Sequence, residues 1–204
     1  MLAEIRVGSV LGADGTVNPG RAGKTGELIV QDAHGQLYEA AYRGNLFSAS
    51  NVAAQAVSAA LATTYTGLCI SNPLGNNKNL VMVGCNFALT VVPAAIASLH
   101  LIAGYSATVN VTHTTPLASP GIQNGLIGGG QPSTAKADSA ATIVNPSYLI
   151  PLGSGFTAAA LPSTSPNWID LKGQFILIPG AWIAIGALTA VTGFGGFVWE
   201  EVPI

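Results

Sequence analysis

The chain has 204 residues, of which 49% are hydrophobic and only 8% are charged. An ordinary soluble domain is about 25% charged. The hydrophobic content excludes an intrinsically disordered chain, which needs low hydrophobicity and high net charge. Seven Lys and Arg residues against nine Asp and Glu residues leave a net charge of −2. This balance argues against a nucleic-acid partner, because no basic field would neutralise phosphates.

The charged residues are concentrated near the N-terminus. Nine of the sixteen lie in residues 1–44, and between Asn45 and Ala135 the only charged residue is Lys78. We therefore divide the chain into an N-terminal arm and β-hairpin, residues 1–44, and a β-sandwich domain, residues 45–204. Large apolar surfaces of soluble proteins usually mark interfaces. We therefore expect the surface of the domain to be partly covered by Ser, Thr, Asn and Gly and partly packed against other subunits.

One apolar segment, residues 175–199, is long enough to span a bilayer as a helix. Five glycines and one proline within it would interrupt that helix, so the segment favours buried β-structure. The N-terminus carries Glu4 and Arg6 where a signal peptide would be apolar. We therefore expect no membrane partner, no export, and synthesis in the cytoplasm.

The first 64 residues contain three predicted elements. Residues 1–20 are rich in Gly, Asn and Pro and predict an extended arm. The segments Glu27–Gln31 and Gln36–Arg43 flank a turn and predict a β-hairpin. The Ala-rich segment Ser50–Thr64 predicts a helix capped near its first residue, with a strand followed by a crossing loop as the alternative.

The rest of the chain predicts many short strands. Tyr65–Ser71 and Leu80–Val92 flank a Pro/Gly/Asn loop, and Ser106–Thr112 alternates strictly, as half-buried strands do. Residues 116–146 predict a long loop. The further predicted strands are Ser147–Leu152, Phe175–Ile178, Trp182–Leu188 and Gly196–Glu201. Together these elements predict an all-β protein, an antiparallel β-sandwich that is jelly-roll-like.

Two glycine-rich segments resemble nucleotide-binding loops. Asn18–Thr25 (NPGRAGKT) matches the end of a phosphate-binding loop, but a predicted strand follows where that loop needs a helix. Gly153–Ala158 (GSGFTA) matches a dinucleotide fingerprint, but prolines follow too soon for a crossover helix. We therefore predict no bound cofactor.

Hydrolase and metal-binding patterns are incomplete. Gly104–Thr108 (GYSAT) begins like a nucleophile elbow but ends in Thr. The three histidines, His34, His100 and His113, lack the spacing of a metal site. The neighbours Glu200 and Glu201 would point to opposite faces of a strand and could not share a substrate. These patterns predict no catalytic residue and no metal site, so we expect the protein not to be an enzyme.

The two cysteines, Cys69 and Cys85, are sixteen positions apart and belong to no C-x-x-C pair. In a protein that is not exported, this spacing predicts two buried thiols. A disulfide across a hairpin is the alternative.

Three segments carry a resemblance to a known group: GELIVQDAHGQLYEAAYRGNLFSAS, LATTYTGLCISNPLGNNKNLVMV and the terminal GGFVWEEVPI. Their succession resembles jelly-roll decoration, or cement, proteins of tailed-bacteriophage heads. The resemblance implies a homotrimer on the outer surface of the virion head, at points where subunits of the major capsid protein meet. It implies the major capsid protein and further copies of this chain as partners.

For the capsid contact we select residues in the charged N-terminal part, because Arg and Tyr combine large contact area with directional hydrogen bonds. The candidates are Arg21, Lys24, Tyr38, Tyr42 and Arg43. Alternatively, the two tyrosines line the core face of the predicted hairpin, since their even spacing puts them on one face of a strand.

Two other function classes use the same fold. A virion module that binds a receptor or a glycan would need an exposed Trp or Tyr in a loop for stacking, and Trp168, beside Pro166 and Asn167, is the candidate. A small esterase or lyase on a β-scaffold would depend on His100 or His113.

Overall fold

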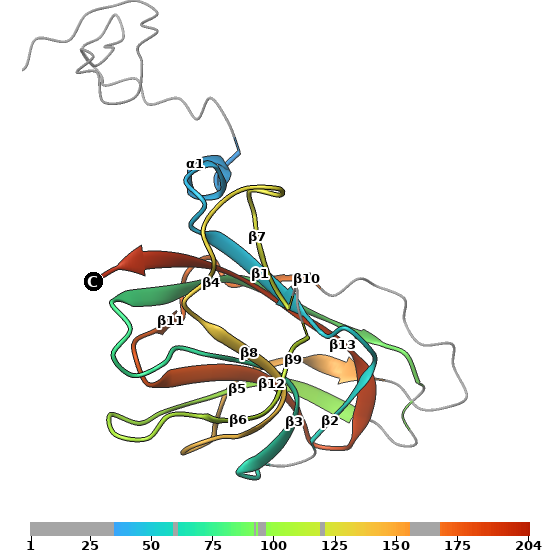
Figure 1. Cartoon of the computed structure of the whole chain (residues 1–204). Helices are drawn as coiled ribbons and strands as arrows, with labels where there is room; N and C mark the ends of the chain where they lie inside the picture. Colours follow the sequence, from blue (N-terminus) through green and yellow to red (C-terminus); the bar gives the residue numbers. More distant parts are fainter. Residues whose placement is uncertain (1–34, 59–60, 92, 94–96, 119–120, 156–167) are drawn as a thin grey trace, which may run out of the picture. The chain divides into compact units, whose positions relative to one another are not determined.

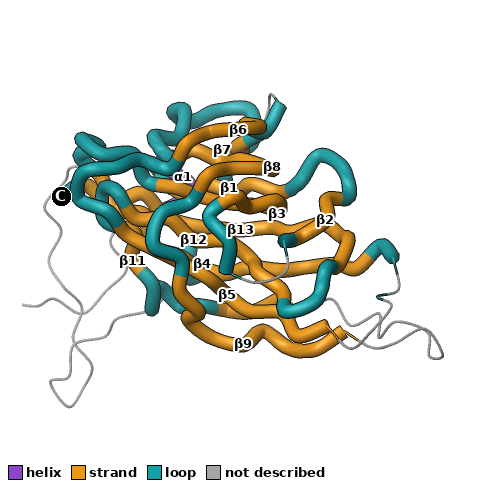
Figure 2. The backbone as a smooth tube through the Cα atoms, turned by 90° about the horizontal axis from the view of Figure 1, so that it is seen from below, coloured by secondary structure: helices purple, strands orange, loops and turns teal. Residues whose placement is uncertain are grey.

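A computed structural model describes residues 35–204 except 59–60, 92, 94–96, 119–120 and 156–167 (Figure 1). Within these residues the chain forms thirteen strands and one short helix. The strands make two antiparallel sheets that pack against each other. Figure 2 shows strands through most of the described chain. The prediction of an all-β antiparallel sandwich is therefore confirmed.

The seven-stranded sheet follows the order β10-β4-β13-β1-β7, with β11 beside β4 and β2 beside β13. Its strands are β1 (Leu46–Ser50), β2 (Gln55–Val57), β4 (Lys78–Leu89), β7 (Ile122–Asn124), β10 (Trp168–Asp170), β11 (Ile176–Leu177) and β13 (Val191–Pro203). The six-stranded sheet follows the order β6-β8-β3-β12-β5-β9. Its strands are β3 (Thr64–Ser71), β5 (Ala97–Tyr105), β6 (Thr112–Pro116), β8 (Lys136–Thr142), β9 (Ser147–Gly155) and β12 (Ala181–Ala187).

Four nested strand pairs give the sandwich a jelly-roll order. β1 pairs with β13, β3 with β12, β4 with β10, and β5 with β9, all antiparallel. Each pair lies inside the previous one along the chain, and successive pairs alternate between the two sheets. This is the arrangement of a two-sheet jelly roll with eight main strands.

The main core lies between the sheets. Phe47 of β1 and Trp199 of β13 stack with ring centroids 6.2 Å apart. Leu101 of β5 and Ile183 of β12 join the same buried cluster from the other sheet. Buried apolar surface contributes about 25 cal/mol per Å², so this cluster is the principal source of stability.

A second buried cluster lies on the other face of the six-stranded sheet. Trp182 belongs to this cluster with Ile102 and Ile143. In that sheet β8 lies near one edge and β9 lies at the other, so the residues between them connect the two edges. Val144 is one of these residues, and its carbonyl accepts a hydrogen bond from Trp182 Nε1 at 2.8 Å. The chain thus covers part of this face itself.

Most predicted strands are confirmed with shifted ends, and β13 (Val191–Pro203) is longer than predicted at both ends. The predicted strands at 65–71, 80–92, 147–152, 175–178, 182–188 and 196–201 correspond to β3, β4, β9, β11, β12 and β13. The apolar segment 175–199 therefore forms strands, as expected. Across the described residues, no helix has the length and apolar character needed to cross a membrane.

The predicted strand Gln36–Arg43 is wrong, because Tyr38–Tyr42 forms helix α1. The sequence Glu39-Ala40-Ala41 has good helix propensity. A pattern of apolar and polar residues over so few positions does not distinguish a strand from a helix. Both tyrosines are exposed, so the alternative that they line a hairpin core is also wrong. The other hairpin strand, Glu27–Gln31, and the arm lie outside the described residues.

A glycine motif ends α1. Gly44 has a φ of 71°; its N–H donates to the carbonyl of Ala41, and the N–H of Asn45 donates to that of Ala40. These two bonds form a Schellman motif. The motif favours a helix over a continuing strand.

The predicted helix Ser50–Thr64 is wrong, and the alternative of a strand with a crossing loop is the better description. β1 reaches Ser50, and β2 occupies Gln55–Val57. Val57 is buried and pairs with Val191 of β13. Burial of this strand outweighs the helix propensity of the alanines.

The predicted strand Ser106–Thr112 is also wrong. β5 ends at Tyr105, and the next strand begins only at Thr112. Ser106 Oγ accepts hydrogen bonds from the N–H groups of Thr108 and Val109, at 3.3 and 3.0 Å. This local turn competes with strand pairing.

The predicted loop at residues 116–146 is wrong in part, because it contains β7 and β8. β8 pairs with β3 on one side and β6 on the other. Its small residues, including the buried Ala137 and Ala141, have little strand propensity of their own. Pairing on both sides stabilises the strand.

Candidate functional site

A shallow groove lies on the outer face of the seven-stranded sheet. Paired residues of four strands form one row across it: Trp168 pairs with Asn86, Asn86 with Gly196, and Gly196 with Ser50. A second row contains Val198 and Ser48, which pair with each other, and Gln123, which pairs with Ser48. The sheet register therefore positions the residues that line the groove.

Two glycines make space for the side chains of the groove. A Cβ atom at Gly84 would collide with the six-membered ring of Trp168, so the indole occupies the space above this glycine. A Cβ atom at Gly196 would collide with Asn86 Oδ1. The indole is 50% exposed, because one side of it lies on the sheet and the rest is open to solvent.

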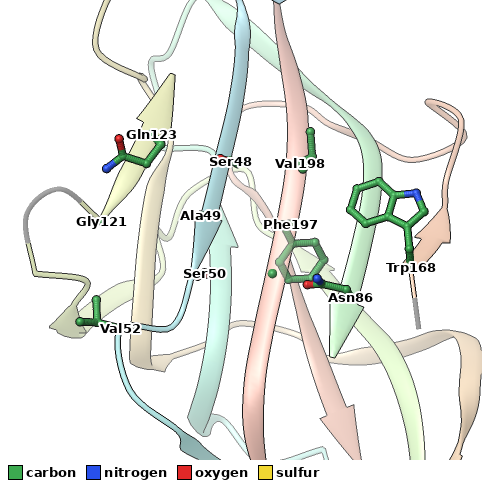
Figure 3. A pocket seen from close by; sticks show the side chains of 11 residues that line it. Ser48, Ala49, Ser50, Val52, Asn86, Gly121, Gln123, Trp168, Phe197 and Val198 are labelled. Carbon is green, nitrogen blue, oxygen red and sulfur yellow. The ribbon is translucent and has the colours of Figure 1, made fainter. Parts of the chain in front are cut away.

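The groove has a volume of about 330 Å³. Figure 3 shows Trp168 and Asn86 on one side of it, and Gln123 and Val52 on the other, with β1 and β13 between them. Its described lining residues carry amides, hydroxyls and apolar groups, and none of them is charged. This lining can stack an apolar ring face and exchange hydrogen bonds with hydroxyl groups.

A second candidate surface, the apical patch, consists of Tyr42 of α1 and the loop residues Leu126 and Ile127. Tyr42 is 63% exposed and Ile127 is 94% exposed. The amide of Asn124 donates to the carbonyl of Gly44, at 2.8 Å, and to the carbonyl of Gln131, at 3.1 Å. Its oxygen accepts the N–H of Leu126 at 2.8 Å. The Asn124 side chain thus joins the base of the loop to Gly44, the glycine that follows α1.

The structure places three of the five predicted capsid-contact residues on or beside α1. Tyr38 and Tyr42 are the ends of α1, four residues apart, and Arg43 follows the helix. Arg43 Nε forms an ion pair with Glu39 Oε1. Arg21 and Lys24 lie outside the described residues, as does the phosphate-loop-like segment Asn18–Thr25.

The predicted stacking residue Trp168 is exposed, but it begins β10 and is not in a loop. Sequence reasoning missed its partners in the groove, Asn86, Gln123 and Ser48. The alternation of Ser48 and Ser50 on one strand was the available signal. Nothing in the sequence placed Asn86 beside Trp168, because that contact depends on pairing between β4 and β10.

His113 and Asp138 form the strongest candidate for acid–base chemistry. His113 Nδ1 lies 2.7 Å from Asp138 Oδ2, and the carboxyl group is buried. Burial raises the pKa of Asp138, and the contact with His113 and the charge of Lys136 oppose that rise. Since His113 belongs to β6 and Asp138 to β8, the pair connects two neighbouring strands. We interpret it as a structural contact.

The carboxylate of Glu201 is a buried polar centre. Lys78 Nζ, Ser133 Oγ and Thr134 Oγ1 donate to it at 2.9, 2.6 and 2.9 Å, and the N–H of Thr134 donates at 2.8 Å. Burial alone would raise the pKa of Glu201, but the hydrogen bonds outweigh burial and lower it. Glu200 is only half-buried, which agrees with the prediction that the two neighbours face opposite ways.

Both cysteines are buried free thiols, as predicted, and the alternative of a disulfide is wrong. Cys69 belongs to the cluster on the outer face of the six-stranded sheet, and Cys85 belongs to the core between the sheets. Burial raises the pKa of both thiols, that of Cys85 to about 11.

Within the described part of the chain, no three His, Cys, Asp or Glu side chains are grouped as a metal site would require. Comparisons with protein-family models, with curated proteins and with solved structures give no match.

Proposed function

We propose that the protein is a structural virion protein that binds the outside of a phage head and stabilises contacts between major capsid subunits. In this proposal it acts as a homotrimer on the outer surface of the head. The sequence resemblance to head decoration proteins supports it, and the jelly-roll order agrees with the fold that the resemblance implies. One fold serves many functions, so features of the surface, not the fold, distinguish this function from others.

The apical patch carries the proposal. Ile127 is 94% exposed, on a loop whose base is hydrogen-bonded to Gly44, two residues after the exposed Tyr42, and contiguous exposed apolar surface usually marks an interaction site. The loop that presents Ile127 is held at its base by the three hydrogen bonds of Asn124. A loop ordered before binding loses less conformational entropy when a partner covers it.

The distribution of charge supports the same function. Between residues 45 and 135 the only charged side chain is Lys78, and its ammonium group is paired with Glu201. Surface in this region can therefore be buried against another subunit with little cost for removing ions from water. This favours a protein that assembles with copies of itself and with a shell.

A binding experiment with heads that lack this protein tests the proposal. We expect saturable binding of the purified full-length chain and increased resistance of the heads to heat. The variant Ile127→Ser should bind about tenfold more weakly, since a central apolar anchor typically contributes more than 1 kcal/mol. The matched control is Ile176→Ser, because Ile176 is also exposed, at 55%, but lies on β11 outside the apical patch.

Two outcomes would contradict this function. Heads that neither bind the protein nor gain heat resistance would exclude decoration. Equal loss of binding in the Ile127 and Ile176 variants would exclude the apical patch as the contact. The trimer has its own test: light scattering should give about three times the chain mass of 20.6 kDa, and a monodisperse monomer at micromolar concentration would contradict it.

A further inference from the structure

The outer face of the seven-stranded sheet carries a second recognition surface, separate from the apical patch. We propose that the groove beside Trp168 binds a neutral oligosaccharide, with one pyranose ring stacked on the indole. This inference depends on the groove alone and does not require that the protein bind a phage head.

Trp168 is the stacking platform. Its ring lies above Gly84, where any larger residue would collide with it, and half of its surface remains exposed. The other two tryptophans, Trp182 and Trp199, are completely buried. The C–H groups on one side of a pyranose ring form an apolar face that suits the electron-rich face of an indole. The exposed side of Trp168 can therefore accept one sugar ring.

Polar groups next to the indole suit the hydroxyl groups of a sugar. Asn86 pairs directly with Trp168 in the sheet, and Ser50 lies two strands further along the same row. Gln123 lines the groove from β7. Amides and hydroxyls both donate and accept hydrogen bonds, as each sugar hydroxyl does.

The charge pattern favours a neutral saccharide over an anionic one. None of the described residues that line the groove is charged, so a phosphate or carboxylate would find no Arg or Lys partner there. Asp170, two residues after Trp168, and Glu200, on the outward side of β13, are acidic. Both would repel an anion.

The size of the groove favours a short saccharide segment. Its volume of about 330 Å³ is near the lower end of the range for small-molecule sites, about 300–1,000 Å³. Gly196 keeps the floor low between Asn86 and Ser50, because a side chain there would collide with Asn86. We therefore expect one or two rings to be in contact at a time.

Titration of the full-length protein with neutral tetrasaccharides of glucan, mannan and chitin type tests the site, with an oligogalacturonate as the anionic comparison. We expect calorimetric binding of at least one neutral member and a change in tryptophan fluorescence, which must come from the exposed Trp168. Trp168→Ala should weaken binding more than tenfold and Asn86→Ala about fivefold. Ile176→Ala, an exposed apolar residue of the same sheet outside the groove, should change it less than twofold.

Three results would overturn the proposal. The first is no binding of any neutral member of the panel by the folded wild-type protein. The second is binding of the oligogalacturonate alone. The third is binding that Trp168→Ala and Asn86→Ala leave unchanged. Circular dichroism of each variant confirms that the sandwich is intact, and Trp168→Phe should retain part of the affinity because it keeps an aromatic face.

Discussion

The ammonium group of Lys78 lies 2.9 Å from Oε2 of Glu201, and this ion pair joins the start of β4 to the end of β13. Glu201 is completely buried and Lys78 is 23% exposed. Ser133 and Thr134 donate to the same carboxylate from the chain just before β8. One buried carboxylate therefore connects two strands of the seven-stranded sheet with the segment that leads into the six-stranded sheet.

The variant Glu201→Gln should lower the free energy of unfolding by about 2–4 kcal/mol, because it removes a buried charge whose donors remain in place. Chemical denaturation at pH 7 measures this change. The matched control is Glu200→Gln, its half-buried neighbour on the other face of the strand, which should change stability by less than about 0.5 kcal/mol. Equal effects of the two substitutions would contradict the special role of Glu201.

The effect of Glu201 should depend on pH. Its folded-state pKa is lowered from the ordinary value of 4.5, so the ionised group stabilises the fold above about pH 4.5. This stabilisation is lost as the pH falls through the lowered pKa. The difference in unfolding free energy between the wild type and Glu201→Gln should therefore be largest at neutral pH and shrink below pH 4.5. A difference that grows in acid would contradict this sign.

The buried strands were predictable from sequence because their patterns are local. Residues 182–188, for example, carry the apolar sequence of a strand buried on both faces, and β12 forms there. The elements that sequence reasoning missed depend on distant partners or on local hydrogen bonds. β8 forms because β3 pairs with one of its edges and β6 with the other. α1 ends in a glycine motif, which a pattern of alternating apolar and polar residues does not reveal.

The groove could be predicted only in part, for the same reason. The sequence identified Trp168 as a stacking candidate because it is a tryptophan beside Pro166 and Asn167. Asn86 lies 82 positions earlier in the chain, and only the pairing of β10 with β4 brings the two together. The predicted capsid-contact residues were chosen by residue type as well. Leu126 and Ile127 were missed because they lie within residues 116–146, where the sequence predicted only a long loop.

His113→Ala should destabilise the protein at neutral pH by about 1–3 kcal/mol, because it leaves the buried carboxyl group of Asp138 without its hydrogen-bond partner. Burial already raises the pKa of Asp138, and removal of His113 should raise it further. A raised pKa means that the folded state favours the protonated acid, so the destabilisation should decrease as the pH is lowered. Thermal unfolding between pH 4 and 8 measures the trend, with the exposed Thr112→Ala as the control on the same strand.

Neither cysteine should react with a thiol reagent while the protein is folded. Both are buried, and the pKa of Cys85 is raised to about 11, so little nucleophilic thiolate is present at pH 8. Labelling with a chromogenic disulfide should detect fewer than about 0.1 reactive thiols per chain in buffer and about two in denaturant. Rapid labelling of one thiol in buffer would show that its strand opens to solvent.

Asn124→Ala should release the apical loop and weaken head binding without unfolding the sandwich. The substitution removes the hydrogen bonds to the carbonyls of Gly44 and Gln131 and from the N–H of Leu126, which should cost about 1–3 kcal/mol. Hydrogen exchange of the amides at residues 125–131 should accelerate, while those of β12 and β13 should keep their protection.

The variant Ile127→Ser tests whether the loop contacts the head directly, independently of whether the loop is ordered. It should weaken head binding and leave hydrogen exchange unchanged, because Ile127 is almost fully exposed and contributes little to folding. Asn86→Ala, an exposed amide on the sheet face, should change neither measurement. If Asn124→Ala accelerates exchange in the loop but heads bind it as tightly as the wild type, preorganisation of the apical patch does not contribute to binding. If heads also bind Ile127→Ser as tightly as the wild type, the contact lies elsewhere on the chain.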